Sequence, residues 1–126
     1  MPRAGQTLLL PKPGHDTKHL WVVAVAANPA TQEVVIVNLT TQRPHSDATV
    51  VLQPSDHEFV NHPTVVFYAD ARIVDGRTID AAIEGGMFPT HRDCSPALLL
   101  RIQQGLFDSP HTPQKVKLFA TYLLGR

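Results

Sequence analysis

The stretch HLWVVAVAANPATQEVVIVNL, residues 19–39, decides the fold prediction. Residues 19–27 are rich in β-branched and aromatic side chains and too continuously apolar for a one-sided helix, which favours a buried strand. Residues 28–32, NPATQ, supply a polar turn, and residues 33–39 resume the apolar run. Two such runs joined by a short polar gap are typical of an antiparallel β-hairpin. The sequence therefore predicts a hairpin here.

Shorter apolar runs on both sides of the hairpin predict further strands. They are separated by proline, glycine and polar residues, which remove backbone donors and favour turns. These strands are predicted at residues 7–10, 49–52, 64–68 and 71–74. Five or six short strands in succession are the number expected of a small barrel. We expect an SH3-like β-barrel or a rolled antiparallel sheet over about residues 6–75.

The last third of the chain changes to helical patterns. The Ser-Pro pair at 95–96 and the Thr-Pro pair at 112–113 each place an N-capping hydroxyl before a proline, a common helix start. We expect one helix up to about Gln104, with Gly105 near its end, and a second up to Gly125. Their apolar faces are predicted to comprise Leu98, Leu99, Ile102 and Leu106 in the first helix, and Val116, Phe119, Tyr122 and Leu123 in the second.

Length and composition limit the class of protein. A chain of 126 residues, 43% of them hydrophobic, is long enough for one domain with its own core. We expect a single α+β domain over residues 1–126, whose helical part covers about residues 78–124 and starts with a helical turn at 78–84. The 11 Lys and Arg balance the 11 Asp and Glu, and this zero net charge argues against a protein that coats nucleic acid through its overall field.

Cysteine content and hydropathy indicate the cellular compartment of the protein. Cys94 is the only cysteine, so no intrachain disulfide forms and a zinc site built on two or four thiolates is excluded. The sequence contains no run of the roughly 18 apolar residues that a membrane span requires. We expect a cytoplasmic protein that is neither secreted nor inserted in a membrane.

Histidine is frequent, with seven in the chain, and His15, His19, His57 and His62 fall in or beside predicted turns. An imidazole has an unperturbed pKa of about 6.5, so it exchanges protons at neutral pH without special tuning. Surface or capping roles are the alternative for each of these residues. His15 and His19 are four residues apart, as in zinc proteases, but the glutamate that gives that motif its chemistry is missing. We therefore expect neither a metal nor another cofactor.

Four segments carry a resemblance to a known family: GHDTKHLWVV at 14–23, VIVNLTT at 35–41, TVVFYADARIVD at 64–75 and CSPALL at 94–99. Their order resembles the MazF/PemK family of growth-inhibitor toxins, which are small barrel-plus-helix endoribonucleases. The resemblance runs from about residue 6 to residue 106. It implies a toxin of a toxin-antitoxin system that cleaves single-stranded RNA, binds an antitoxin protein and forms a homodimer.

The resemblance also implies site residues. Lys18 stands where the family has its catalytic arginine, with His19 beside it, and Thr40 or Thr41 matches the family's hydroxyl partner. Lysine supplies positive charge but lacks the planar fork with which arginine grips a phosphate. This substitution makes His19 a candidate to take over part of the chemistry.

The residue types suggest a metal-independent mechanism, in which a base takes a ribose 2′-hydroxyl proton and an acid protonates the departing 5′-oxygen. His19 and His57 are the candidates for base and acid. Lys18 would stabilise charge on phosphorus, and Thr41 would orient the phosphate. The candidates for substrate binding are Thr40, His62 and Tyr68.

Two other interpretations stay open. The same small barrel can bind a peptide, an antitoxin or a nucleic acid without chemistry. A structural subunit of a phage or mobile-element assembly would instead expose a large apolar interface. The nuclease requires that four residues converge on one concave site, namely Lys18, His19, Thr41 and His57, whereas their scattering favours a binding module.

Overall fold

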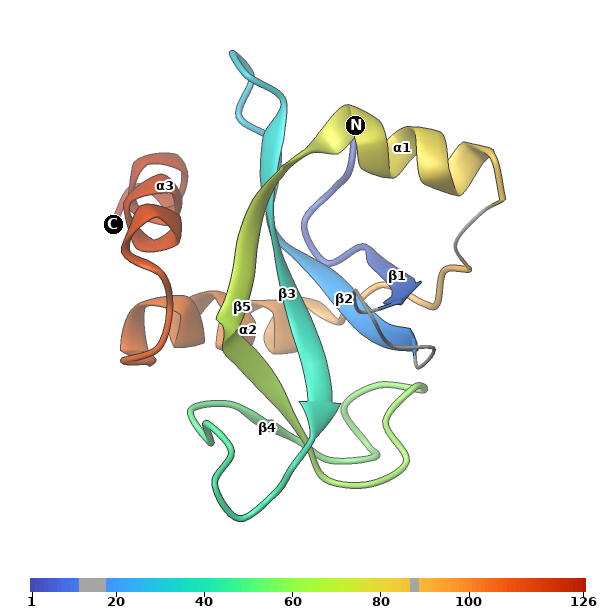
Figure 1. Ribbon diagram of the computed structural model, residues 1–126, viewed down its shortest axis with the longest axis vertical. Coiled ribbons are helices and arrows are strands. Elements are labelled where there is room, and N and C mark those ends of the chain that lie inside the picture. The colour runs from blue at the N-terminus through green and yellow to red at the C-terminus, as the bar shows by residue number, and fades with distance from the viewer. Residues whose placement is uncertain (12–17, 87–88) are drawn as a thin grey trace.

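A five-stranded antiparallel sheet, curled into a half-barrel, forms the body of the protein (Figure 1). The computed structural model describes residues 1–11, 18–86 and 89–126. The strands are β1 (Thr7–Pro11), β2 (Lys18–Val25), β3 (Glu33–Thr41), β4 (Val51–Leu52) and β5 (Thr64–Asp75). They lie in the order β1-β2-β3-β5-β4. The α+β class and the rolled antiparallel sheet predicted from the sequence are confirmed.

The predicted hairpin is formed by β2 and β3. Trp21 lies opposite Asn38, and the register shifts between Val23 and Val25. Such an irregularity increases the local bend of a strand, which suits a sheet that curls. Successive residues of each strand face opposite sides of the sheet, so a continuous apolar run of this kind requires cover on both faces.

β5 is one strand where the sequence predicts two, at 64–68 and 71–74. Both halves pair with β3: Thr41 lies opposite Thr64 at one end, and Glu33 lies opposite Asp75 at the other. The register shifts in the middle of this pairing. The polar residues between 68 and 71, which suggested a break between two strands, therefore lie at an irregularity within one continuous strand.

Three helices cover the two faces of the sheet: α1 (Gly76–Glu84), α2 (Pro96–Asp108) and α3 (Gln114–Leu124). Figure 1 shows α2 behind the sheet, α3 at one side and α1 across the top. The larger core joins the sheet to α2 and α3 and includes Leu20, Val22, Val37, Tyr68, Leu98, Ile102, Leu106, Val116 and Ala120. A smaller core beneath α1 consists of Leu8, Trp21, Val23, Val34, Ile36 and Ile79. From Leu20 to Ala24 the odd and even residues of β2 thus contribute to different cores, and Val25, beyond the register shift, joins the larger one.

The start of α2 is confirmed and its end is corrected. The Ser95 hydroxyl oxygen accepts a hydrogen bond from the backbone N–H of Leu98 (3.1 Å), as an N-cap does. The helix does not end near Gln104 but continues through Gly105 to Asp108. A Cβ on Gly105 would lie 2.0 Å from the Tyr68 hydroxyl oxygen. Gly105 therefore permits a close approach of the sheet to the helix and does not terminate it.

Two predictions for α3 are also corrected. Thr112 does not cap the helix, which begins after Pro113 with no side-chain cap, and its hydroxyl is buried instead. Tyr122, predicted on the apolar face, is 77% exposed. The core-facing side is set by Val116 and Ala120, and a residue two positions beyond Ala120 points to the opposite side of a helix. In the part of the chain that the structure describes, no helix is both long and apolar enough to cross a membrane.

Candidate functional site

A hollow of about 240 Å³ opens at the end of β3, next to the start of β2 and the loop that leads into β5. Its walls consist of His19, Leu39, Thr40, Thr41, Phe59, Asn61, His62 and Thr64. The pairing of Thr41 with Thr64 across β3 and β5 brings the loop before β5 to this end of the sheet. This site, the histidine hollow, brings together four residues that the sequence predicts: His19, Thr40, Thr41 and His62.

A short chain of hydrogen bonds links three side chains in the histidine hollow. The Nδ1 of His62 contacts the Oδ1 of Asn61, and its Nε2 lies 2.9 Å from the Oγ1 of Thr41. An amide oxygen only accepts hydrogen bonds, so Nδ1 carries the proton. In the neutral ring Nε2 is then the acceptor, and the Thr41 hydroxyl donates to it. Asn61 thus sets the tautomer of His62 and its orientation toward Thr41.

His19 is held in a similar way from the other side of the hollow. Its Nδ1 lies 3.3 Å from the backbone carbonyl oxygen of Leu39, on the neighbouring strand. Because a carbonyl oxygen only accepts, this contact places the proton of the neutral ring on Nδ1 and leaves the lone pair on Nε2. The ring is half-buried. His19 and His62 therefore both have Nε2 as the nitrogen that is basic in the neutral state.

Lys18 precedes His19 as the first residue of β2, where its backbone lies opposite Pro11 of β1. The side chain of Lys18 lies outside the described part of the structure, and so does His15. The predicted role of Lys18 as a phosphate-binding cation therefore stays a prediction, although the strand places its Cα next to that of His19.

His57 does not join the histidine hollow. Its ring is 7% exposed, its Nε2 donates to the carbonyl oxygen of Arg92 (2.5 Å), and its Nδ1 accepts from the backbone N–H of Phe59 (3.1 Å). Both ring nitrogens are therefore occupied by backbone groups, which leaves none for a substrate. Through these two hydrogen bonds the ring connects the loop before β5 to the segment before α2. The predicted role as catalytic acid does not fit this position.

Tyr68 does not fit its predicted role either. Its side chain is completely buried, and its hydroxyl donates to the carbonyl oxygen of Ile102 in α2 (2.8 Å). Burial, together with the negative charges of Asp47 and Asp108, raises the pKa of Tyr68. A ring in this position stabilises the sheet against α2 and cannot contact an RNA base.

Four wall residues of the hollow were missed by sequence reasoning, namely Leu39, Phe59, Asn61 and Thr64. Asn61 stands next to His62, and an amide beside a histidine is a weak signal that the imidazole has an orienting partner. Phe59 contacts the His91 ring edge-on, with 5.3 Å between the ring centroids. No pattern in the sequence brings these two segments together.

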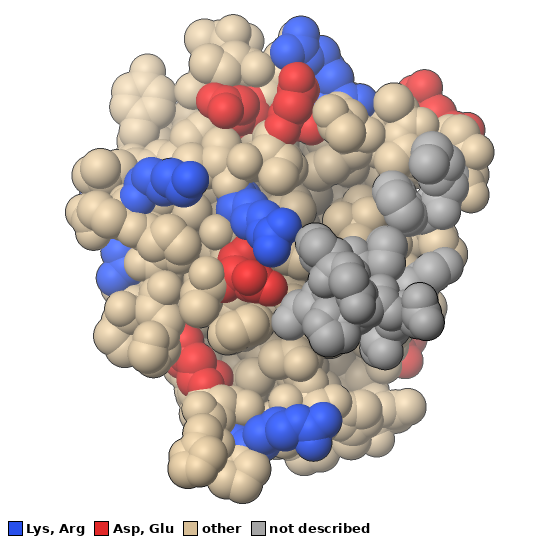
Figure 2. Space-filling model, in the orientation of Figure 1, with Lys and Arg blue, Asp and Glu red and all other residues tan. Residues whose placement is uncertain are grey.

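Comparisons with protein-family models, with curated proteins and with solved structures found no match. The chemistry of the site is therefore inferred from its own residues. Within the described ranges, no three His, Cys, Asp or Glu side chains are grouped as they would be around a metal ion. In the view of Figure 2, Lys and Arg side chains stand apart from one another, and several lie beside acidic side chains.

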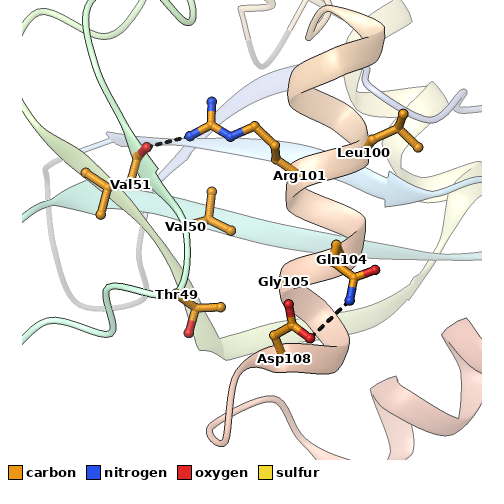
Figure 3. Close-up of a pocket in the computed structure, with 8 residues that line it drawn as sticks. All are labelled: Thr49, Val50, Val51, Leu100, Arg101, Gln104, Gly105 and Asp108. Atoms are coloured by element: carbon orange, nitrogen blue, oxygen red, sulfur yellow. Dashed lines mark hydrogen bonds between the residues drawn. The ribbon is translucent and has the colours of Figure 1, made fainter.

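A separate depression lies between α2 and residues 49–51 (Figure 3). Arg101 crosses it and donates to the carbonyl oxygen of Val51 (2.7 Å), while Gln104 donates to Asp108 (3.0 Å). The strongest donors at this depression are thus already paired within the protein. It contains no histidine and none of the residues predicted for the site. The histidine hollow is the better candidate for chemistry.

Proposed function

We propose that the histidine hollow is the active site of a metal-independent endoribonuclease that cleaves single-stranded RNA. The observation that carries the proposal is the pair of imidazole rings, His19 and His62, each held through Nδ1 and both lining one hollow beside Thr40 and Thr41. Cleavage through the ribose 2′-hydroxyl requires one group that takes a proton and one that gives a proton near neutral pH. Histidine is the side chain best suited to both tasks.

In the proposed reaction, His19 is the base. Its Nε2 takes the proton of the 2′-hydroxyl, and the resulting 2′-oxygen attacks the adjacent phosphorus. The bond from phosphorus to the 5′-oxygen breaks, and protonated His62 gives its Nε2 proton to that oxygen. The products are a 2′,3′-cyclic phosphate and a 5′-hydroxyl end. Each positioned proton transfer typically contributes about 10²–10⁴ in rate.

The hydrogen bonds of His62 are compatible with both of its protonation states. The Asn61 oxygen accepts from Nδ1–H whether or not Nε2 is protonated. The Thr41 hydroxyl donates to Nε2 in the neutral ring and can rotate to accept from it in the charged ring. Both hydrogen bonds of the exposed His62 ring can therefore persist when the ring gains or loses a proton. In this scheme His62 takes the acid role that the sequence suggested for His57.

The remaining roles follow the prediction from sequence. Thr40 and Thr41 bind the phosphate through their hydroxyls, and Lys18 stabilises the extra charge on phosphorus. The wider biological role, a toxin that acts in the cytoplasm, pairs as a homodimer and is bound by an antitoxin protein, is supported by the MazF/PemK resemblance of residues 6–106.

The test is cleavage of a long single-stranded RNA by the purified protein in the presence of a chelator. His19→Gln and His62→Gln should each lower the cleavage rate by about 10²-fold or more. Lys18→Ala should lower it as well. The matched control is His111→Gln, because His111 is exposed on the connection between α2 and α3.

Two results would contradict the proposal. If both histidine variants cleave RNA at the wild-type rate, the histidine hollow is not the active site. RNA that stays intact with the wild-type protein, but is bound by it, would support the non-catalytic binding module instead.

A further inference from the structure

A second hollow, of about 310 Å³, lies directly across Thr40 and Thr41 from the first. The two hollows share these two threonines, which form a ridge between them at the end of β3. The second hollow, here the arginine hollow, is also lined by Arg43, His45 and Asp47 and by two residues of β5, the buried Val65 and the half-buried Phe67. A chain bound across the ridge would contact both hollows.

The rim of the arginine hollow is held by local hydrogen bonds. The backbone N–H of Arg43 donates to the Ser46 hydroxyl oxygen (2.7 Å), and the Ser46 N–H donates to the Arg43 carbonyl oxygen (3.1 Å). The preceding residue, Gln42, donates from its N–H to the Pro63 carbonyl oxygen (3.0 Å). These bonds fix the turn that carries the exposed side chains of Arg43 and His45, so both stand beside the threonine ridge.

The carboxylate of Asp47 also lines the arginine hollow, and a negative charge there would oppose the binding of a phosphate. It accepts hydrogen bonds from the Ser109 hydroxyl (2.6 Å) and from the backbone N–H of Thr49 (3.0 Å). Burial alone would raise the pKa of Asp47, but these hydrogen bonds and the charge of His111 lower it below its ordinary value. Its oxygens thus accept from donors within the protein, whereas the side chain of Arg43 is exposed at the rim of the same hollow.

The chemistry of this hollow matches a nucleotide. A guanidinium binds a phosphate through two parallel hydrogen bonds, and an imidazole adds a further donor. An aromatic ring such as that of Phe67 accepts the face of a base, as aromatic side chains commonly do in single-stranded nucleic-acid sites. The histidine hollow contains no guanidinium, and its two imidazoles, His19 and His62, are assigned to proton transfer.

We propose that the arginine hollow binds the nucleotide next to the scissile phosphate, with Arg43 and His45 on its phosphate and its base against the half-buried ring of Phe67. This inference rests on the proposed function, because it assigns the neighbouring subsite of the same RNA strand. It also gives a chain without net charge a way to hold RNA, because Arg43 and Lys18 act as local cations at the site in place of a basic surface.

The test uses a fluorescently labelled 2′-O-methyl hexanucleotide, which binds but cannot be cleaved through the 2′-oxygen. Its affinity for the full chain is measured by anisotropy at several salt concentrations. Arg43→Ala should weaken binding by about tenfold, the loss expected for a charge-assisted hydrogen bond. It should also reduce the slope of log Kd against log salt by about 0.7, the value for one phosphate contact on a single strand. Arg43→Lys should restore the slope but only part of the affinity.

The matched control is Arg126→Ala, which removes the same charge from the far end of the chain and should change neither affinity nor slope. Equal affinities and slopes for wild type and Arg43→Ala would overturn the subsite, whatever the wild-type protein does to cleavable RNA. If instead the Arg43 effect is present but wild type cleaves no RNA, the catalytic proposal fails and the arginine hollow stands as a nucleotide-binding site.

Discussion

Replacing Gly105 by alanine tests the packing of α2 against the sheet. In an ordinary helix interior this change stabilises a protein by about 1 kcal/mol. Here the added Cβ would lie 2.0 Å from the Tyr68 hydroxyl oxygen and 2.7 Å from the Val50 Cγ2. Figure 3 shows Val50, the residue before β4, beside Gly105 of α2. Relief requires Tyr68 to move, and this movement breaks its hydrogen bond to Ile102.

The magnitude follows from three contributions. Overpacking of a core costs about 1–3 kcal/mol, the lost buried hydrogen bond costs about 1 kcal/mol, and the helix propensity returns about 1 kcal/mol. The free energy of unfolding should therefore fall by roughly 2 kcal/mol, which lowers Tm by roughly 8 °C in a domain of this size.

Urea titration followed by circular dichroism measures this difference, with the denaturant slope expected to stay constant. Leu100→Ala on the same helix is the control, because Leu100 is 59% exposed and its loss should change stability by less than about 0.5 kcal/mol. The double variant Tyr68→Phe with Gly105→Ala should be less destabilised than the sum of the two single changes, since it removes the closest overlapping atom. A Gly105→Ala protein as stable as the wild type would refute the described packing.

Three further predictions concern stability and positioning. Thr112→Val should raise the free energy of unfolding by about 1 kcal/mol in a thermal melt, because the buried hydroxyl has no hydrogen-bond partner among the described residues; a loss of stability would contradict this. Burial first, and the charge of Asp93 second, raise the pKa of Cys94 from 9.0 to about 11. A raised pKa keeps the folded thiol neutral, so stability should be intact below about pH 9 and fall between pH 9 and 11 in urea titrations; Cys94→Ala should lack this part of the decline. Asn61→Ala should lower the single-turnover cleavage rate about tenfold, which is part of the 10²–10⁴ that a positioned acid supplies. It should also alter the pH profile of that rate. An unchanged rate and an unchanged profile would show that His62 needs no orienting partner.

Much of the fold was predictable because local patterns agree with the tertiary structure. The run at 19–39 is apolar on both faces, and both faces are indeed buried, one by α2 and α3 and the other by α1. The errors arise where tertiary contacts override a local signal. Gly105 is typical of a helix end, but in the structure it lies inside α2 because Tyr68 packs against it. Asp70 is typical of a break between strands, but both halves of β5 pair with β3.

The site was only partly predictable for a related reason. His19, Thr40 and Thr41 lie at the ends of paired strands, so their proximity follows from the hairpin. His57 and His62 have the same residue type and both flank the loop before β5, and sequence does not distinguish which ring is buried. The structure does so through backbone partners: His57 is bonded at both nitrogens to backbone groups, whereas the partners of His62 are the side chains of Asn61 and Thr41.

The most direct test of the central claim, that His19 and His62 cleave RNA through the 2′-hydroxyl, uses an oligonucleotide with one ribose in an otherwise 2′-O-methyl strand. In the presence of a chelator, the wild-type protein should cut only after that ribose and leave a 2′,3′-cyclic phosphate and a 5′-hydroxyl. The double variant with His19→Gln and His62→Gln should leave the strand intact. Cutting at 2′-O-methyl positions, products with a 5′-phosphate, or undiminished cleavage by the double variant would contradict the account.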